Sequence, residues 1–295
     1  MRCLRSSPRV DYMSRLRVLQ ATGTRKPVYC FTGIGGQLDM YQHLARLLRD
    51  DRPVYGAKMV GSEGECEPLR EMQQLAATHA ADIRGVQPHG PYFLFGYWFG
   101  GVLSFEVARE LISHGERVGL VGMANSPAPG FPKIPSPLFR ARAHIRKFAT
   151  LAGGDRLQYL RARLHHRTRV TQRMLGVRDP VDDVAENTQD PRERRVGNAL
   201  AEAYTHYAPT PLSVDVLFLS PDIPPDWPPT KFHDPLLGWG PVMRGRIIQC
   251  QTPGSHLSMF DPGNVEVLVQ HLRAALAQAE RALAGEPVMT SRAHP

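Results

Sequence analysis

The sequence predicts an α/β fold in which a mostly parallel sheet is flanked by helices. Short apolar runs alternate with segments whose apolar residues recur at helical spacing, and this alternation is typical of βαβ units. The chain has 295 residues, of which 42% are hydrophobic, so it is long enough to bury a sizeable core as one large domain. The alternation runs through residues 27–129 and resumes after residue 206.

The predicted strands are short apolar runs that end at glycine, proline or polar residues. In chain order they lie at residues 28–31, 54–57, 92–95, 118–124, 214–219 and 246–251. Helices are predicted where apolar residues return to one stripe, at residues 40–48, 72–86 and 102–112, with a last long helix over residues 265–283. Gly115 follows the third helix, at the position where glycine commonly ends a helix.

Three segments fall outside this alternation. Residues 1–26 are rich in arginine and serine, and we interpret them as a tail or an ordered arm over the core. Residues 130–205 form a helical, basic insertion that is only partly apolar, and residues 284–295 are interpreted as a C-terminal tail. The core therefore has two parts, residues 27–129 and residues 206–283.

The composition argues against several classes of protein. No run of eighteen or more apolar residues is present, and no apolar segment follows the basic N-terminus, so neither a membrane span nor a signal peptide is expected. The four cysteines show no C-x-x-C spacing and no paired framework, which favours a reducing cytoplasm. The net charge of +8 has no nucleic-acid-binding motif beside it, and the histidines lack metal-ligand spacing, so we expect no nucleic-acid partner, metal or cofactor.

One turn of the chain has the sequence pattern of a catalytic elbow. The strand at 92–95 leads into Gly96, Tyr97, Trp98, Phe99 and Gly100, and a helix follows. In α/β-hydrolases the same strand, turn and helix carry G-x-S-x-G, with the nucleophilic serine at the tip of a sharp turn. Trp98 stands at the serine position, and an indole cannot attack a carbonyl. The sequence therefore keeps the elbow of an α/β-hydrolase without its nucleophile.

Three segments in the right order resemble the thioesterase family that ends polyketide and nonribosomal-peptide assembly lines. Residues 31–36 resemble the first loop of that family, residues 96–101 its Gly-Tyr-Ser-x-Gly-Gly elbow, and residues 252–259 its Gly-x-His segment. The resemblance covers residues 27–283 and implies an α/β-hydrolase fold. It also implies that residues 130–205 form a helical lid over the active site, although a peripheral excursion with no gating role is the alternative.

The resemblance implies a role for each matching residue. Ile34 and Phe99 lie where the family has the two backbone N–H donors of its oxyanion hole, and Gly33 precedes Ile34 in the same loop. His256 lies at the position of the general base, and Asn125 stands where many members have an aspartate. The loss of the aspartate adds to the loss of the serine, and both departures weaken acyl-serine chemistry.

Other side chains are candidates for the missing groups. Asp222, and after it Asp226, follow the strand at 214–219 and are alternative acids for the general base, with an exposed loop position as the competing interpretation. Cys30 lies within a strand and is interpreted as a core residue, and neither Ser104 nor Ser126 is a convincing nucleophile. The tryptophan at the elbow is either a plug in a dead pocket or a wall that offers one N–H donor.

The resemblance leaves three functions open. The first is an atypical enzyme that binds a carrier-bound or newly released intermediate, with His256 as general acid or base in cyclisation, condensation or release without an acyl-serine. The second is a pseudo-thioesterase that docks a carrier protein or synthase, and the third is a hydrolase with an unrecognised nucleophile. We favour the first, because a pure scaffold needs no histidine here. The expected partner is an acyl or peptidyl carrier protein with a phosphopantetheine-linked substrate, which the basic insertion would attract.

Overall fold

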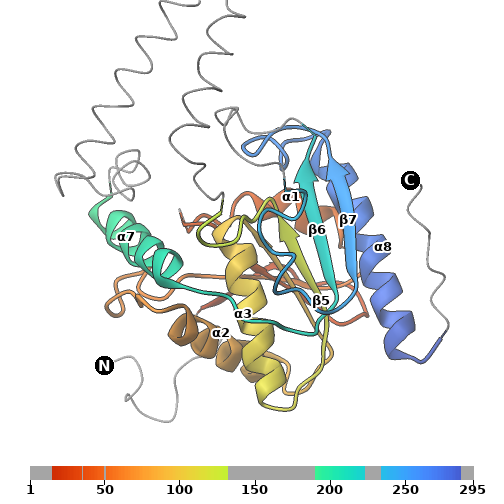
Figure 1. Ribbon diagram of the computed structural model, residues 1–295, viewed down its shortest axis with the longest axis horizontal. Helices are drawn as coiled ribbons and strands as arrows, with labels where there is room; N and C mark the ends of the chain where they lie inside the picture. The colour runs from red at the N-terminus through yellow and green to blue at the C-terminus, as the bar shows by residue number, and fades with distance from the viewer. Residues whose placement is uncertain (1–14, 35, 50, 132–189, 223–233, 287–295) are drawn as a thin grey trace, which may run out of the picture.

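The protein is described here by a computed structural model that covers residues 15–34, 36–49, 51–131, 190–222 and 234–286 (Figure 1). Within these ranges the strands form one seven-stranded sheet in the order β1-β3-β2-β4-β5-β6-β7. Every neighbouring pair is parallel except β1 with β3, which is antiparallel. The predicted α/β fold with a mostly parallel sheet is confirmed. The strands are β1 (Leu16–Gln20), β2 (Val28–Phe31), β3 (Val54–Ala57), β4 (Tyr92–Tyr97), β5 (Val118–Ala124), β6 (Val216–Pro221) and β7 (Ile247–Thr252).

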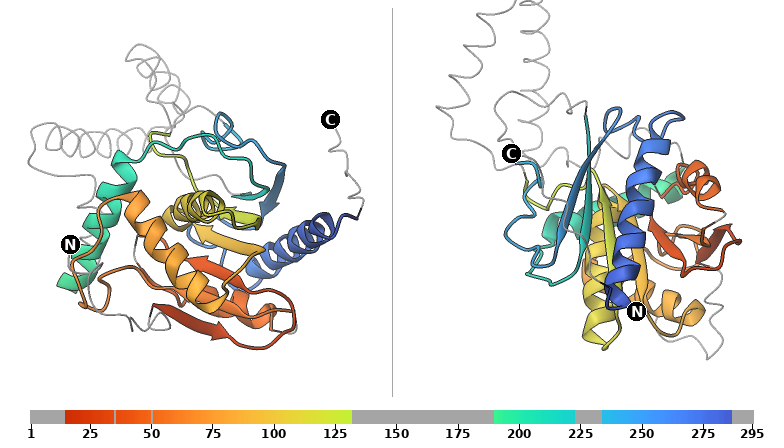
Figure 2. Two further views of the ribbon diagram at one scale, coloured as in Figure 1. Left: turned by 90° about the horizontal axis from the view of Figure 1, so that it is seen from below. Right: turned by 90° about the vertical axis from the view of Figure 1, so that its right-hand side faces the viewer.

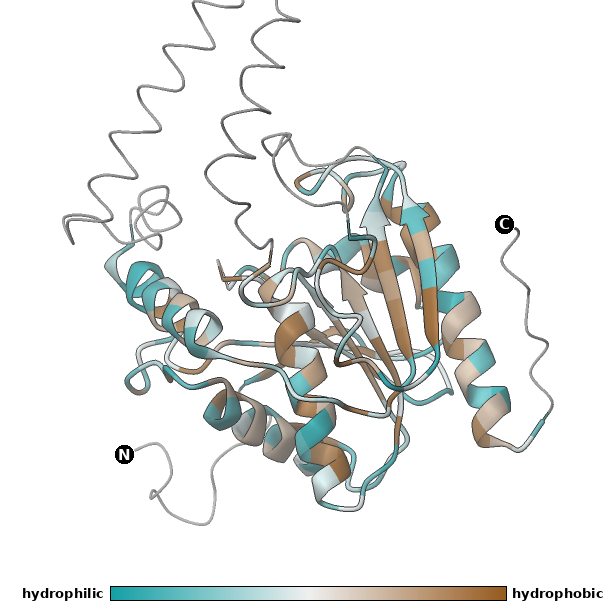
Figure 3. Ribbon diagram, in the orientation of Figure 1, coloured by the Kyte–Doolittle hydropathy of each residue, from teal (hydrophilic) through white to brown (hydrophobic). Residues whose placement is uncertain are grey.

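Helices cover both faces of the sheet and create two separate cores. Successive side chains of a strand point to opposite faces, so on β4 Tyr92 and Leu94 pack with α2 and α3, whereas Phe93 and Phe95 pack with α1 and α8. Figure 2 shows the sheet between these two helical layers, and Figure 3 shows hydrophobic residues along the inner strands. The helices are α1 (Tyr41–Leu47), α2 (Met72–Val86), α3 (Phe99–Ser113), α7 (Pro191–His206) and α8 (Val265–Leu283).

The segment before residue 27 contributes to the sheet. Leu16 is buried opposite Ala57 of β3 in one core, Leu19 packs against the core on the other face of the sheet, and Val18 is 45% exposed. The expected tail or arm therefore includes a strand, β1, that covers the edge of β3. The sequence pattern hid this strand because it is short and flanked by arginines.

Several expectations fall on residues that the structure does not describe. Residues 132–189, which include most of the basic insertion, lie outside the described ranges, as do residues 1–14, 223–233 and 287–295. The last part of the insertion is α7, which Asp190 caps by accepting a hydrogen bond from the Arg192 N–H at 2.8 Å. No helix in the described part of the chain is both long enough and apolar enough to cross a membrane.

At least one cysteine is paired. Cys66 is disulfide-bonded, so the expectation that the cysteines form no pairs is wrong at this position. Cys30 and Cys250 are free thiols. Because disulfides persist mainly in oxidising compartments, the cysteine pattern no longer argues for a reducing one.

The parallel strands bring the candidate site together at one edge. The loops that follow the carboxyl ends of β2, β4, β5, β6 and β7 all meet at that edge, which is where ligands bind in open α/β sheets. The first loop, the elbow and the histidine segment come from residues that are far apart in the chain, and the topology alone makes them neighbours.

Candidate functional site

The elbow keeps the backbone of a nucleophile turn. Trp98 joins β4 to α3 at φ 51° and ψ −114°, a sparsely populated region for a bulky side chain that costs about 1–3 kcal/mol. Its N–H donates to the Ala124 carbonyl at 3.0 Å. A Cβ on Gly96 would lie 2.1 Å from the carbonyl of Gly100, and one on Gly100 would lie 2.0 Å from the Phe31 carbonyl. The turn therefore has room only for glycine at positions 96 and 100.

The indole of Trp98 lies between the first loop and the histidine. Its ring meets the His256 ring edge-on, with centroids 5.9 Å apart and an interplanar angle of 86°. On the other side, a Cβ added to Gly33 would lie 3.7 Å from Cε3 of the indole. The side chain is half-buried, and its Nε1–H has no hydrogen-bond acceptor among the described residues. The indole thus lies between the first loop and the imidazole of His256, and its Nε1–H is an unused donor among the described residues.

His256 is paired with Asn125. The Asn125 side chain, which is 5% exposed, lies with Nδ2 2.6 Å from Nδ1 of the imidazole. Asn125 follows β5 at φ 42°, and its own N–H donates to the Leu219 carbonyl at 2.8 Å, so its position is anchored to β6. Asparagine tolerates the left-handed region better than most residues, which explains how this loop keeps its shape without glycine.

Asp222 is not the partner of the histidine. Its side chain is exposed, and among the described residues no hydrogen bond or ion pair joins its carboxylate to His256. Its backbone N–H donates to the Thr252 carbonyl at 2.8 Å, which continues the pairing of β6 with β7. The described structure therefore pairs His256 with Asn125 and not with Asp222. Asp226 lies outside the described residues.

The imidazole of His256 is neutral at physiological pH. Burial lowers its pKa below the ordinary value, because removing water disfavours the charged ring. Asn125 carries no charge that could reverse the shift. An asparagine can face an imidazole with its nitrogen, which leaves the proton on Nε2, or with its oxygen, which leaves Nε2 free to accept a proton. Rotation of one amide thus decides whether Nε2 is an acid or a base.

The two backbone N–H groups that the resemblance assigns to an oxyanion hole are both unpaired in the part of the chain that the structure describes. Within the described residues neither the Ile34 N–H nor the Phe99 N–H has a hydrogen-bond acceptor. Phe99 is the first residue of α3, so its N–H also carries the partial positive charge of a helix N-terminus. The Ile34 side chain is 5% exposed and touches α7, where a Cβ on Gly197 would lie 3.6 Å from it. The end of the basic insertion therefore covers the first loop.

Tyr97 is a site residue that the sequence did not single out. Its hydroxyl donates to the His256 carbonyl at 2.7 Å, and its ring lies against the imidazole with centroids 4.9 Å apart. The sequence offered one signal for it: Tyr97 is the last residue of β4, immediately before the tip of the elbow, and so lies at the same edge of the sheet as the site. Residue spacing alone could not show that it meets a histidine 159 positions later.

Comparison with known proteins assigns this geometry to a family. The family described as the thioesterase domain matches residues 26–194, which is more than half of the chain and includes the first loop and the elbow. The chain belongs to the thioesterase domain family. The predicted resemblance to assembly-line thioesterases is confirmed by the family match and by the relatives and structures that the domain is similar to.

The relatives of this thioesterase domain are longer synthetases. The inactive atromentin synthetase invA6 of Paxillus involutus is 28% identical over 271 residues, which make up 88% of this chain and 27% of that protein. Indigoidine synthase of Dickeya dadantii (strain 3937) is 39% identical over 129 residues, 44% of this chain and 8% of that synthase. The RedJ thioesterase from the prodiginine pathway of Streptomyces coelicolor has a TM-score of 0.57 at 21% identity, covering 85% of this chain and 86% of RedJ, and shows the shared fold.

None of the three side chains considered from the sequence, Cys30, Ser104 and Ser126, replaces the serine in this thioesterase domain. Cys30 is fully buried in β2, and burial raises the pKa of its thiol far above the ordinary value, so it forms no thiolate. The Ser126 hydroxyl donates to the Ala124 carbonyl at 3.1 Å, and the Ser104 hydroxyl to the Gly100 carbonyl at 2.7 Å. The described residues also contain no cluster of three or more His, Cys, Asp or Glu side chains that could hold a metal ion.

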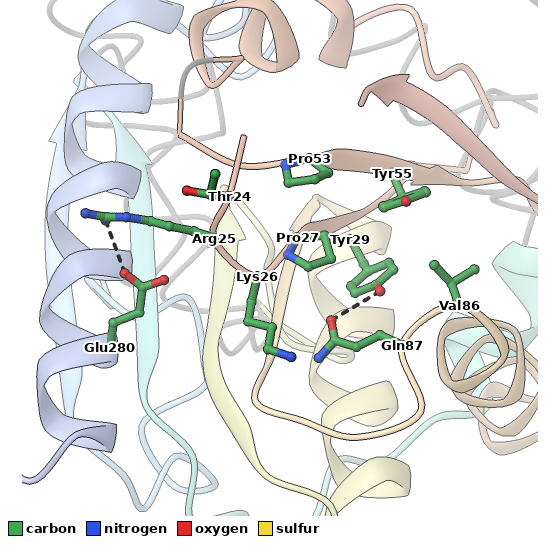
Figure 4. Close-up of a pocket in the computed structure, with 10 residues that line it drawn as sticks. All are labelled: Thr24, Arg25, Lys26, Pro27, Tyr29, Pro53, Tyr55, Val86, Gln87 and Glu280. Carbon is green, nitrogen blue, oxygen red and sulfur yellow. Dashed lines mark hydrogen bonds and ion pairs between the residues drawn. The ribbon is translucent and has the colours of Figure 1, made fainter. Parts of the chain in front are cut away.

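A pocket of 640 Å³ lies at the opposite edge of the sheet (Figure 4). It is lined by residues that precede or begin β2 and β3, together with the ends of α2 and α8. Most polar groups that line it are already paired: Arg25 reaches Glu280 at 3.2 Å, and the Tyr29 hydroxyl donates to Gln87 at 3.3 Å. Because the parallel strands run away from this edge toward the elbow, the pocket is separate from the candidate site.

Proposed function

We propose that this thioesterase domain acts on acyl or peptidyl chains delivered by a carrier protein, and that it does so without an acyl-serine intermediate. The observation that carries the proposal is the pairing of His256 with Asn125 at 2.6 Å beside an elbow whose tip is Trp98. In this proposal His256 is the proton-transfer group, the N–H groups of Ile34 and Phe99 are the two backbone donors, and the tip of the elbow supplies no nucleophile. Such a site can still transfer protons and stabilise an oxyanion.

The relatives support a carrier protein as the partner. The proteins this domain is similar to include synthetases far longer than the chain, and one is named nonribosomal peptide synthetase btyA, from Aspergillus terreus. An enzyme of that class holds its intermediates as thioesters on a phosphopantetheine arm. We infer that a chain resembling one part of such a synthetase receives its substrate on the same kind of arm, with the pathway being one of secondary metabolism.

The reaction we propose is a direct displacement at the thioester. A hydroxyl or amine of the bound chain, or a water molecule, attacks the carbonyl carbon while Nε2 of His256 takes the proton of the attacking group. This step requires the Asn125 amide to turn its oxygen toward Nδ1–H, the orientation that leaves Nε2 free to accept a proton. The N–H groups of Ile34 and Phe99 stabilise the oxyanion. The C–S bond then breaks, and the imidazolium returns the proton to the departing thiolate. Attack from within the chain gives cyclisation, and attack by water gives release.

Trp98 has a defined role in this mechanism. Its indole forms a rigid apolar wall between the first loop and the imidazole, where it excludes water from one side of the carbonyl. Its unused Nε1–H can donate to an oxygen of the substrate. The side chain blocks the covalent route and leaves the attack to a group that the substrate supplies.

A second function is favoured by one specific observation. The same indole that could form a wall also fills the space between Gly33 and His256, where an acyl carbonyl would have to enter. If it does not move, the domain is a pseudo-thioesterase that binds a carrier protein or synthase without chemistry. One similar protein, the atromentin synthetase invA6, is itself named as inactive.

Intact-protein mass spectrometry with octanoyl-pantetheine distinguishes these functions. Wild type, Trp98→Ser and His256→Ala are compared for covalent adduct and for released product. Product from wild type without an adduct, lost in His256→Ala, supports the atypical enzyme. No product from wild type, with octanoyl-pantetheine shown to bind, contradicts it and supports the pseudo-thioesterase. An acyl adduct on wild type overturns both and reveals a nucleophile that lies elsewhere in the chain.

A further inference from the structure

We propose that Tyr97 is a positioning residue that fixes the ring plane of His256 and so aims Nε2 at the reacting carbonyl. The inference rests on the proposed function for its chemistry, but its structural part concerns the histidine alone. Tyr97 lies at the end of β4, and His256 lies in the loop after β7. The contact therefore joins the two segments whose relative placement determines whether the base faces the elbow.

The contact has two components. The Tyr97 hydroxyl donates to the backbone carbonyl of His256 at 2.7 Å, which holds the main chain of the loop. The two rings lie 4.9 Å apart at an interplanar angle of 31°, so the flat face of the phenol supports the imidazole. One component places the residue, and the other restricts its side chain.

The geometry of the histidine explains why a second restraint is needed. The hydrogen bond with Asn125 determines where Nδ1 lies, but a single hydrogen bond leaves the imidazole able to tilt about that point. The neighbouring Leu257 is 87% exposed, so the buried anchor of the loop is Met259, which holds the main chain and not the plane of the imidazole. An aromatic face against the ring removes the remaining freedom, and Trp98 contacts the same ring edge-on.

Tyr97 is itself rigidly held, as a positioning residue must be. Its backbone N–H donates to the Tyr41 hydroxyl at 3.1 Å, and that hydroxyl donates to the Phe31 carbonyl at 2.7 Å. The ring of Phe260 meets both Tyr97 and Tyr41 edge-on, at 5.3 and 5.5 Å. The last residues of β2 and β4 and the histidine loop are thus joined through one buried aromatic cluster, which sets the imidazole against the first loop and the elbow.

The test uses the full chain with Trp98→Ser as the parent, so that a fluorophosphonate probe can report on the base. Tyr97→Phe removes the hydroxyl and keeps the ring, whereas Tyr97→Leu removes both. Tyr92→Phe is the matched control, because Tyr92 is a buried tyrosine of the same strand whose hydroxyl donates to the Gln87 carbonyl at 2.8 Å, away from the histidine. Histidine-labelled NMR spectra of each variant report the ring environment and the pKa of His256, and circular dichroism verifies folding.

We expect Tyr97→Leu to slow labelling about a hundredfold, since misplacement of a catalytic group by about 1 Å can cost that much. The pKa of His256 should rise toward its ordinary value as water reaches the ring. Tyr97→Phe should slow labelling about tenfold and leave that pKa nearly unchanged, because the aromatic face remains. Tyr92→Phe should resemble the parent in both measurements.

Two results would overturn the proposal. One is that folded Tyr97→Leu and Tyr97→Phe both match the parent in labelling rate and in the His256 resonances. The other is that Tyr92→Phe lowers the rate as much as Tyr97→Phe does, which would reduce the effect to general loosening of β4. Because these readouts need no turnover by wild type, they remain decisive if the proposed displacement reaction is not observed.

Discussion

His256 at the carboxyl edge of the sheet and His79 in the middle of α2 are histidines whose pKa values burial lowers, in very different surroundings. His79 is fully buried, neither of its ring nitrogens has a hydrogen-bond partner in the described part of the chain, and its ring meets Phe31 edge-on at 5.5 Å. His256 is half-buried, its Nδ1 faces Asn125, and Nε2 has no partner among the described residues.

The two histidines show that a neutral imidazole need not take part in chemistry. Removal of water keeps both rings neutral, and beside His79 the positive charge of Arg15 lowers the pKa further. A neutral imidazole is therefore no sign of function in itself. What distinguishes His256 is that Nδ1 is hydrogen-bonded to Asn125, the Tyr97 ring lies against the imidazole, and Nε2 has no partner among the described residues.

Removing the ring of His256 should affect the chemistry of the site far more than removing the ring of His79. In a Trp98→Ser background, His256→Ala should slow fluorophosphonate labelling at least about 10³-fold, because a serine without its general base is a poor nucleophile. His79→Leu in the same background should change the rate less than about threefold, since distant substitutions act independently. Labelling kinetics followed by intact mass measure both.

The control is the single Trp98→Ser chain, which must label. If it labels equally fast with and without His256, the imidazole takes no part in activating the new serine. In that case the contacts of His256 with Asn125 and Trp98 contribute to packing and not to catalysis.

Much of the fold could be predicted because its signals are local. Short apolar runs and helical stripes depend only on neighbouring residues, so β3, β5 and α8 were expected with the bounds they have. The elbow also followed from local sterics, since Gly96 and Gly100 stand where no Cβ fits. Strand β1 escaped prediction because it is only five residues long and has an arginine among its apolar residues, which leaves little pattern to detect.

The site could be predicted only in part, because its contacts join distant segments. The resemblance named His256 and Asn125 from their segments, but the choice between Asn125 and Asp222 as its partner depends on the loop geometry after β5 and β6. The contact of Tyr97 with the histidine depends on side-chain direction, which no spacing encodes. Aromatic residues at such places are expected in any core, so their role emerges only when the strands are placed.

The second prediction is that His79 makes the folded protein less stable at acid pH. The pKa of this ring is lowered from 6.5 to about 3 by burial. The unfolded chain binds the proton near 6.5, so below that pH it binds more protons than the folded chain and stability falls. Between pH 7 and pH 5 this histidine should cost about 2 kcal/mol of unfolding free energy.

His79→Leu should remove that loss, because leucine leaves no ionisable ring and no unpaired nitrogen in the core. Urea unfolding at pH 7 and pH 5 measures the difference between wild type and variant, and contributions from other groups cancel in the subtraction. The window lies above the range of the carboxylates, whose own titration would complicate lower pH. A variant whose stability falls by the same amount as wild type contradicts the assignment of the acid sensitivity to His79.

A third substitution changes the charge beside His256 and should alter the pKa of its ring. Asn125→Asp puts a carboxylate beside Nδ1 of His256 and should raise the pKa of the imidazole, to above its ordinary value, because a negative charge favours the charged ring. Aspartate tolerates the positive φ at this position, so the backbone can stay as it is. The carboxylate only accepts hydrogen bonds, so Nδ1 must keep its proton, and Nε2 becomes the base. The folded chain then binds the proton more tightly than the unfolded chain, so the added stability is present below about pH 6.5 and disappears as pH rises through the new pKa.

NMR titration of histidine resonances measures the shift, and His79 in the same spectra is the internal control. A His256 pKa that stays below its ordinary value would mean that the carboxylate does not face the ring, and the observed pairing with Asn125 would then have no electrostatic counterpart.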